Sequence, residues 1–69
     1  MSEIQAVIFN KHKYSISAAE SWLTKYNITP MKYHITKNYI RFRIRAPSKY
    51  KYYSMYNIND NIKLVIGYK

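Results

Sequence analysis

The sequence predicts a small α+β domain in which one amphipathic helix covers one face of a mostly antiparallel sheet, in the order β-α-β-β-β. Three patterns carry this prediction. Apolar and basic residues alternate over 39–46, a similar alternation precedes them over 31–36, and apolar residues recur at helical spacing between 16 and 26. Because the chain has only 69 residues, we expect a single domain over 1–69 with a small core.

A strand and then a helix are predicted for the first part of the chain, because the spacing of the apolar residues changes after residue 13. Residues 5–9 read Gln-Ala-Val-Ile-Phe, a run whose β-branched and aromatic members favour a strand, and polar residues 10–13 suggest a loop. A helix should follow, because one arc of a helical projection collects Ile16, Ala19, Trp22, Leu23 and Tyr26.

The ends of this helix carry their own signals. Ser15 or Ser17 can cap its start, and Ser17 with Glu20 has the spacing of a capping box. Asn27 can adopt the left-handed conformation that ends a helix, and Pro30 prevents its continuation.

A β-hairpin is predicted next, from strands over 31–36 and 39–46 joined by a turn at 37–38. Pairing Ile35 with Ile40 sorts both strands into an apolar face and a basic face. Residues 48–56 suggest a loop passing into a strand, residues 58–61 suggest a turn, and the alternation from Ile62 predicts the last strand.

The charge balance points to an anionic partner. Lys and Arg number 12 against three Asp and Glu, a net charge of +9. The absence of cysteine excludes disulfides and thiolate metal sites. Residues 1–10 lack the pattern of a signal peptide and no apolar run is long enough to span a membrane, so we expect a soluble protein that is not secreted.

The candidate site is the basic face of the hairpin. The predicted register places Lys32 opposite Arg43 and His34 opposite Arg41, with Arg45 extending the row. Thr36 and Tyr39 lie at its turn end. We expect this face to bind nucleic acid, DNA or RNA, through phosphates. The full set of predicted contacts is Lys32, His34, Arg41, Arg43, Arg45 and Tyr39, with Lys11 and Lys13 before the helix as auxiliary residues. Five such contacts predict a salt slope of about −4.5 on duplex DNA.

Other interpretations of the same residues stay open. The basic face can be a solvated surface that prevents edge-to-edge aggregation, or it can bind an acidic protein. An exposed sheet edge can mediate dimerisation. A group of tyrosines near two lysines either completes the core or stacks on bases, and comprises Tyr50, Tyr52, Tyr53 and Tyr56.

An enzyme is not expected. Glu3 belongs to a terminus predicted to be mobile, Glu20 to the capping box and Asp60 to a turn, which leaves no carboxylate pair for acid-base chemistry. His12 and His34 have no further ligands at metal-binding spacing. We therefore expect neither cofactor nor metal.

The combination of motifs resembles a known domain. An Ala-x-x-Trp-Leu helix over 19–23 and a Tyr-x-Arg-Phe-Arg strand over 39–43 are flanked by Val-Ile-Phe-Asn-Lys over 7–11 and Ile-Lys-Leu-Val-Ile-Gly over 62–67. Nearly the whole chain is similar to a small domain of tailed-bacteriophage head-associated proteins and of short proteins in large DNA viruses. The resemblance implies an α/β domain of viral origin, in host cytoplasm, nucleus or virion, without an assigned activity. The family often has Gln and Gly where this chain has Ile44 and Asn27.

Overall fold

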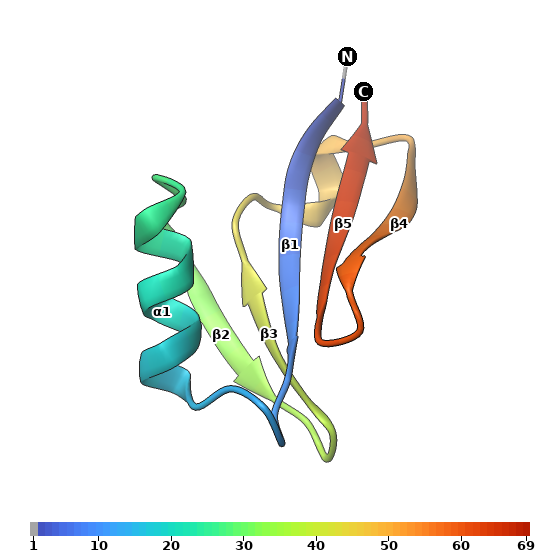
Figure 1. Cartoon of the computed structure of the whole chain (residues 1–69). Coiled ribbons are helices and arrows are strands. Elements are labelled where there is room, and N and C mark those ends of the chain that lie inside the picture. The colour runs from blue at the N-terminus through green and yellow to red at the C-terminus, as the bar shows by residue number, and fades with distance from the viewer. Residues whose placement is uncertain (1) are drawn as a thin grey trace.

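Five antiparallel strands form one sheet, and a single helix packs on one of its faces (Figure 1). A computed structural model describes residues 2–69. The elements are β1 (Ser2–Asn10), α1 (Ile16–Lys25), β2 (Lys32–Ile35), β3 (Tyr39–Arg43), a 3-10 turn η1 (Pro47–Lys49), β4 (Tyr52–Asn59) and β5 (Ile62–Tyr68). The strand order is β2-β3-β1-β5-β4.

This architecture confirms the predicted α+β class with one helix on one sheet face. It contains one strand more than the predicted element order, because the tyrosine-rich segment becomes the full strand β4. The turn before β5 is correspondingly shorter than expected and leaves Asp60 and Asn61 outside both strands. No helix within residues 2–69 combines the length and apolar character needed to cross a membrane.

Residues line up across the sheet in regular rows. On the helix side, one row joins Tyr33, Phe42, Val7, Leu64 and Tyr56. On the other side, the neighbouring row joins His34, Arg41, Ile8, Lys63 and Asn57. The predicted hairpin register is confirmed, since Ile35 pairs with Ile40 and Lys32 with Arg43. Each row therefore keeps one chemical character over the hairpin.

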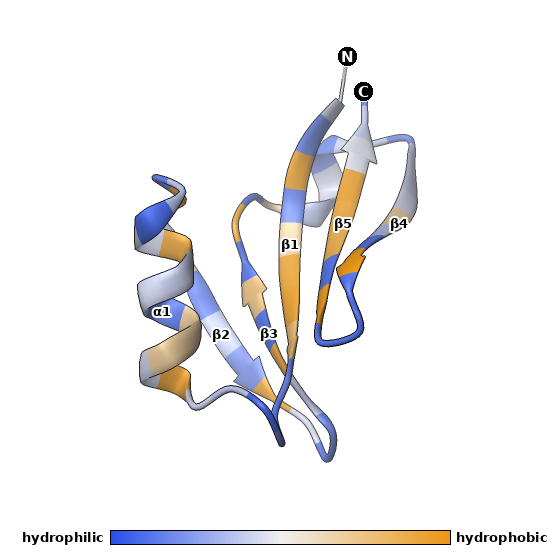
Figure 2. Ribbon diagram, viewed as in Figure 1, coloured by the Kyte–Doolittle hydropathy of each residue, from blue (hydrophilic) through white to orange (hydrophobic). Residues whose placement is uncertain are grey.

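The core lies between α1 and the central strands. Phe9 and Phe42 are fully buried and meet edge to face, with ring centroids 5.6 Å apart. Trp22 packs edge-on against Phe9 from the helix at 5.6 Å, and Ala19 and Leu23 are buried beside it. Figure 2 shows hydrophobic residues concentrated along β1 and β5, which lie in the interior of the sheet.

The helix ends where predicted but is capped by one of the two candidate serines. The Oγ atom of Ser15 accepts the Ala18 N–H at 3.1 Å, whereas Ser17 lies inside the helix. The predicted Ser17–Glu20 capping box is wrong, because a cap residue must precede the first helical turn. Asn27 adopts a φ of 58° at the other end, which confirms it as the left-handed terminator.

The face of the sheet opposite the helix is partly covered by the chain itself. Tyr50, which follows η1, is only 9% exposed and packs against Gly67 of β5. A Cβ atom at Gly67 would lie 2.5 to 2.7 Å from the Tyr50 ring. The single glycine of the chain therefore permits the close approach of this aromatic ring.

Candidate nucleic-acid interface

The β2–β3 hairpin gathers basic side chains on the face opposite the helix. Lys32 pairs with Arg43 and His34 with Arg41. Arg41 and Arg43 are two residues apart on one strand, a spacing of about 6.7 Å. Lys32, His34 and Arg41 are exposed, and Arg43 is half-buried. This is the arrangement that the alternating sequence predicted.

A further cation joins this surface from β5. Lys63 pairs with Ile8, and Ile8 pairs with Arg41, so Lys63 lies in the Arg41 row at two strand spacings, about 9.6 Å away. Its Nζ atom is 5.5 Å from the centre of the Tyr39 ring. We call Lys32, His34, Arg41, Arg43 and Lys63 the basic strip. The alternation of β5 indicates that Lys63 faces away from the core, but only the strand order brings it near Arg41.

A shallow depression occurs within the basic strip. It has a volume of about 340 Å³ and is lined by Lys32, Tyr33, His34, Arg41 and Arg43. Three permanent cations from two strands surround it. Arg and Lys side chains in this arrangement suit a phosphate or carboxylate, which accepts charge-assisted hydrogen bonds from several donors at once.

Gln5 connects the basic strip to the chain beyond it. It is only 1% exposed and occupies the irregular position of β1 between Ile4 and Ala6. The Nη2 atom of Arg41 donates to its Oε1 atom at 3.4 Å, and its own Nε2 atom donates to the Arg45 carbonyl at 2.9 Å. Gln5 therefore holds Arg41 in position without itself being exposed to a ligand.

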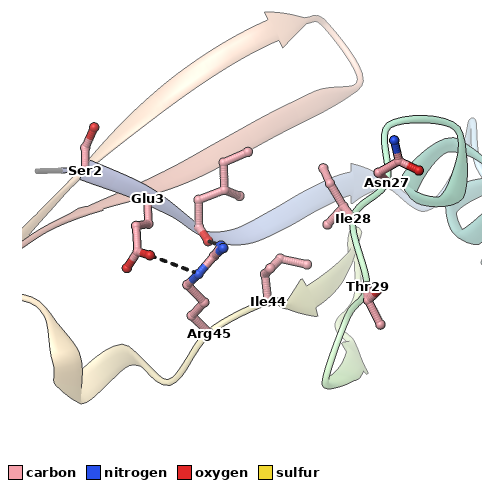
Figure 3. Close-up of a pocket in the computed structure, with 8 residues that line it drawn as sticks. Ser2, Glu3, Asn27, Ile28, Thr29, Ile44 and Arg45 are labelled. Carbon is pink, nitrogen blue, oxygen red and sulfur yellow. Dashed lines mark hydrogen bonds and ion pairs between the residues drawn. The ribbon is translucent and has the colours of Figure 1, made fainter.

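Arg45 does not extend the row of the basic strip, in contrast to the arrangement predicted from the alternation. β3 ends at Arg43, because the N–H groups of Ile44 and Arg45 both donate to the Gln5 carbonyl, at 2.8 and 3.1 Å. Arg45 then turns toward β1, where Nη1 donates to the Ile4 carbonyl at 2.8 Å and Nε lies 3.4 Å from Glu3 Oε2 (Figure 3). Its guanidinium group is therefore paired within the chain, with a carboxylate that it shares with Lys69.

Glu3 lies at the centre of this cluster. It was expected in a mobile terminus, but it lies in β1 and contacts three partners. Its carboxylate accepts the Tyr50 hydroxyl at 2.9 Å and pairs with Lys69 at 3.2 Å, in addition to Arg45. The Tyr50 hydrogen bond, followed by Lys69 and Arg45, lowers the pKa of Glu3, whereas burial and then the Glu3 contact raise the pKa of Tyr50. This cluster has a structural role.

The two auxiliary lysines lie in the turn between β1 and α1, and both are exposed. The Nζ atom of Lys11 donates to the Thr36 carbonyl at 3.2 Å, and its N–H donates to the Asn38 carbonyl at 3.0 Å. Lys11 therefore borders the hairpin turn, where Asn10 pairs with Tyr39. Lys13 has only a backbone contact to Asn10.

The tyrosine group is divided among different tasks. Tyr50 is buried, and the Tyr53 hydroxyl donates to the Pro47 carbonyl. Tyr52 stacks on Tyr68 with centroids 4.8 Å apart, whereas Tyr56 is 62% exposed. One tyrosine of the group is thus buried. The other three belong to β4, at the opposite edge of the sheet from β2.

The acidic residues are dispersed. Glu20 is exposed on α1, Asp60 lies in the β4–β5 turn, and Glu3 belongs to the cluster with Arg45. Within residues 2–69, no three side chains of the metal-ligating types come together.

Comparison with known proteins returned no match to any protein-family model, curated protein or solved structure. A functional conclusion therefore rests on the residues and geometry of this chain. In the basic strip several positive charges converge without a carboxylate partner. The two ion pairs found within residues 2–69 both involve Glu3, which lies outside the strip.

Proposed function

We propose that the protein is a non-enzymatic nucleic-acid-binding module that contacts phosphates through the basic strip. The observation that supports this proposal is the convergence of Lys32, Arg41, Arg43 and Lys63 from three strands onto one face. A row of cations at strand spacing matches the repeated charges of a nucleic-acid backbone, which dominates affinity in non-specific complexes.

The energetics of the hairpin support the same proposal. Lys32 and Arg43 are directly opposed on neighbouring strands, and opposed like charges destabilise a sheet by up to about 1 kcal/mol. A purely structural surface has no use for this cost. A bound phosphate removes it, because the anion lies between the two cations and attracts both.

The expected binding mode is electrostatic. Four cations that each neutralise one phosphate give a slope of log affinity against log salt of about −3.6 on duplex DNA. This value replaces the steeper slope expected from the sequence, because Arg45 is paired with Glu3. Sequence preference should be weak, since phosphate contacts carry no base identity.

Fluorescence anisotropy with labelled duplex DNA, single-stranded DNA and RNA tests this proposal. The informative variant is Arg41→Gln with Arg43→Gln, and the matched control is Lys25→Gln with Lys49→Gln, which removes the same charge from exposed positions outside the strip. We expect a loss of affinity of about tenfold or more for the strip variant at low salt, and a much smaller loss for the control. Equal losses for both would mean that net charge alone drives binding.

The setting that we propose for this module is a virus, with nucleic acid bound in host cytoplasm or nucleus or inside the virion. This part rests on the resemblance of residues 19–23 and 39–43 to the phage and large-virus domain. A pull-down from infected cells, with and without nuclease, separates a nucleic-acid tether from direct contact with a viral protein. Recovery of the same proteins after nuclease treatment would favour a protein-assembly module.

The second candidate function, protein assembly, is favoured by a separate observation. β4 lies at an edge of the sheet, and all of its residues are exposed. It lies at the opposite edge of the sheet from the β2–β3 hairpin and touches the basic strip only through β5, where Asn57 pairs with Lys63. A partner strand on the outer edge of β4 therefore leaves the hairpin cations accessible.

A further inference from the structure

We infer that β4 is a homodimerisation edge, which pairs antiparallel with β4 of a second copy about a twofold axis near Tyr56. The eight residues of β4 include no charged residue, no glycine and no proline. Large side chains are exposed along the strand, at Tyr52, Tyr53, Met55, Tyr56 and Ile58. The outer side of an edge strand presents unpaired N–H and C=O groups, which a further strand can satisfy.

The opposite edge of the sheet is protected in the way that soluble proteins protect such edges. β2 has only four residues, and two of them are Lys32 and His34. Short edge strands with charged side chains discourage pairing with another chain. The long, uncharged β4 has neither protection, so the two edges differ in their readiness to add a strand.

Charge complementarity identifies the second copy as the occupant. Lys51 immediately precedes β4 and Asp60 immediately follows it. An antiparallel pair of β4 strands with Met55 or Tyr56 on the twofold axis places Lys51 of each copy within one residue of Asp60 of the other, which allows two complementary contacts related by the axis. Neither residue has an ion-pair partner within residues 2–69 of its own chain.

The apolar surface next to β4 fits the same arrangement. A groove of about 400 Å³ lies between α1 and β4 and is lined by Ile4, Trp22, Tyr26, Ile28, Ile58 and Leu64. A twofold axis perpendicular to the sheet keeps the two helices and the two grooves on the same side of the joined sheet. Tyr56 belongs to the helix-side row and is 62% exposed, so pairing near this residue buries two tyrosines beside two such grooves.

The position of the basic strip permits this dimer despite the net charge of +9 per copy. In a ten-stranded sheet, the two β3 strands would be seven strand spacings apart, about 34 Å along the sheet, and the two β5 strands, which carry Lys63, three spacings apart, about 14 Å. Both separations exceed the screening length of about 10 Å at ordinary ionic strength. Salt therefore weakens the repulsion between the two strips, most strongly between the two β2–β3 hairpins.

Multi-angle light scattering in the absence of nucleic acid tests the inference. The wild-type mass should rise from the 8.4 kDa of one chain toward twice this value between low micromolar and near-millimolar concentration. Met55→Lys should hold the protein monomeric. Met31→Lys is the matched control, because Met31 is equally exposed (65% against 57%) but precedes the protected edge strand. A wild-type chain that stays monomeric throughout overturns the inference, as does equal dissociation by both variants.

Cysteine cross-linking tests the geometry independently. The chain contains no cysteine, so single substitutions at Ser54, Met55, Tyr56 and Asn57 can be compared without background. A residue on a twofold axis faces its own copy at about 4.5–5.5 Å between Cα atoms, a distance that a disulfide spans. We expect covalent dimer from one or two of these positions and none from Met31→Cys. Equal yields from all five variants would contradict an ordered β4 seam.

The charge contacts give a final check. Asp60→Lys should lower the dimer population at low salt, and the double reversal Lys51→Asp with Asp60→Lys should restore it. An unaltered population in both variants would exclude the proposed direction of pairing. These measurements contain no nucleic acid. A failure to dimerise would therefore not contradict the proposed phosphate binding, and a failure to bind phosphates would not contradict the dimer.

Discussion

The hairpins β2–β3 and β4–β5 flank the central strand β1 and use the same architecture for different surfaces. Both direct apolar residues toward α1 in shared rows. On β2 and β3 the other face is basic, whereas β4 carries no charge at all. The comparison shows that the alternate residues of a strand that face the helix determine its place in the fold. The residues that face the other side are free to specify a partner.

The largest expected effect is a difference in unfolding free energy between substitutions at two positions of one row. Phe42 and Tyr56 belong to the same helix-side row, but Phe42 is fully buried and Tyr56 is 62% exposed. Phe42→Ala should cost about 3–5 kcal/mol of unfolding free energy, and Tyr56→Ala should change it by less than about 0.5 kcal/mol. Urea denaturation at a concentration where the chain is monomeric measures both. Similar losses would mean that the two hairpins contribute equally to the core.

A medium effect is expected at the glycine beneath Tyr50. Gly67→Ala introduces a Cβ atom 2.5 to 2.7 Å from the Tyr50 ring, and overpacking of this kind costs about 1–3 kcal/mol. The double variant Gly67→Ala with Tyr50→Ala should show a smaller additional cost than the sum of the single changes. Strict additivity in this double-mutant cycle would show that the two residues do not interact in solution.

The smallest effect concerns acid stability. The pKa of Glu3 is lowered in the folded chain from its ordinary value of 4.5, so the stabilisation from Glu3 is fully present above this value and is lost as pH falls through the folded pKa. Thermal unfolding at neutral pH and at progressively lower pH should therefore show a smaller acid-induced decrease of Tm in Glu3→Gln than in the wild type. An identical decrease in both proteins would place the acid sensitivity elsewhere.

Local patterns predicted the elements and the hairpin, and long-range contacts decided the rest. The register of β2 and β3 was predictable because both strands sort apolar from basic residues with a period of two. The orientation of Arg45 was not, since it depends on Gln5, forty residues away, whose carbonyl bends the chain after β3. Lys63 was missed for a related reason: its approach to Arg41 depends on the strand order.

β4 shows the limit of composition as a predictor of burial. The tyrosine group suggested either core residues or base-stacking platforms, and the structure buries Tyr50 before the strand but leaves the three tyrosines of β4 exposed. The strand's backbone pairs with β5, and its side chains remain exposed on both faces. Periodicity cannot separate these outcomes in a strand without an apolar face, because alternation then carries no signal.

The most direct test of the basic strip compares two neighbouring arginines in a salt titration of duplex-DNA affinity. Arg43 belongs to the strip, whereas Arg45 is paired with Glu3. The wild type should show a slope of about −3.6, Arg43→Gln should reduce its magnitude by about 0.9, and Arg45→Gln should leave it unchanged. A wild-type slope near zero, or equal reductions by the two variants, would contradict the assignment of this face as the phosphate-binding surface.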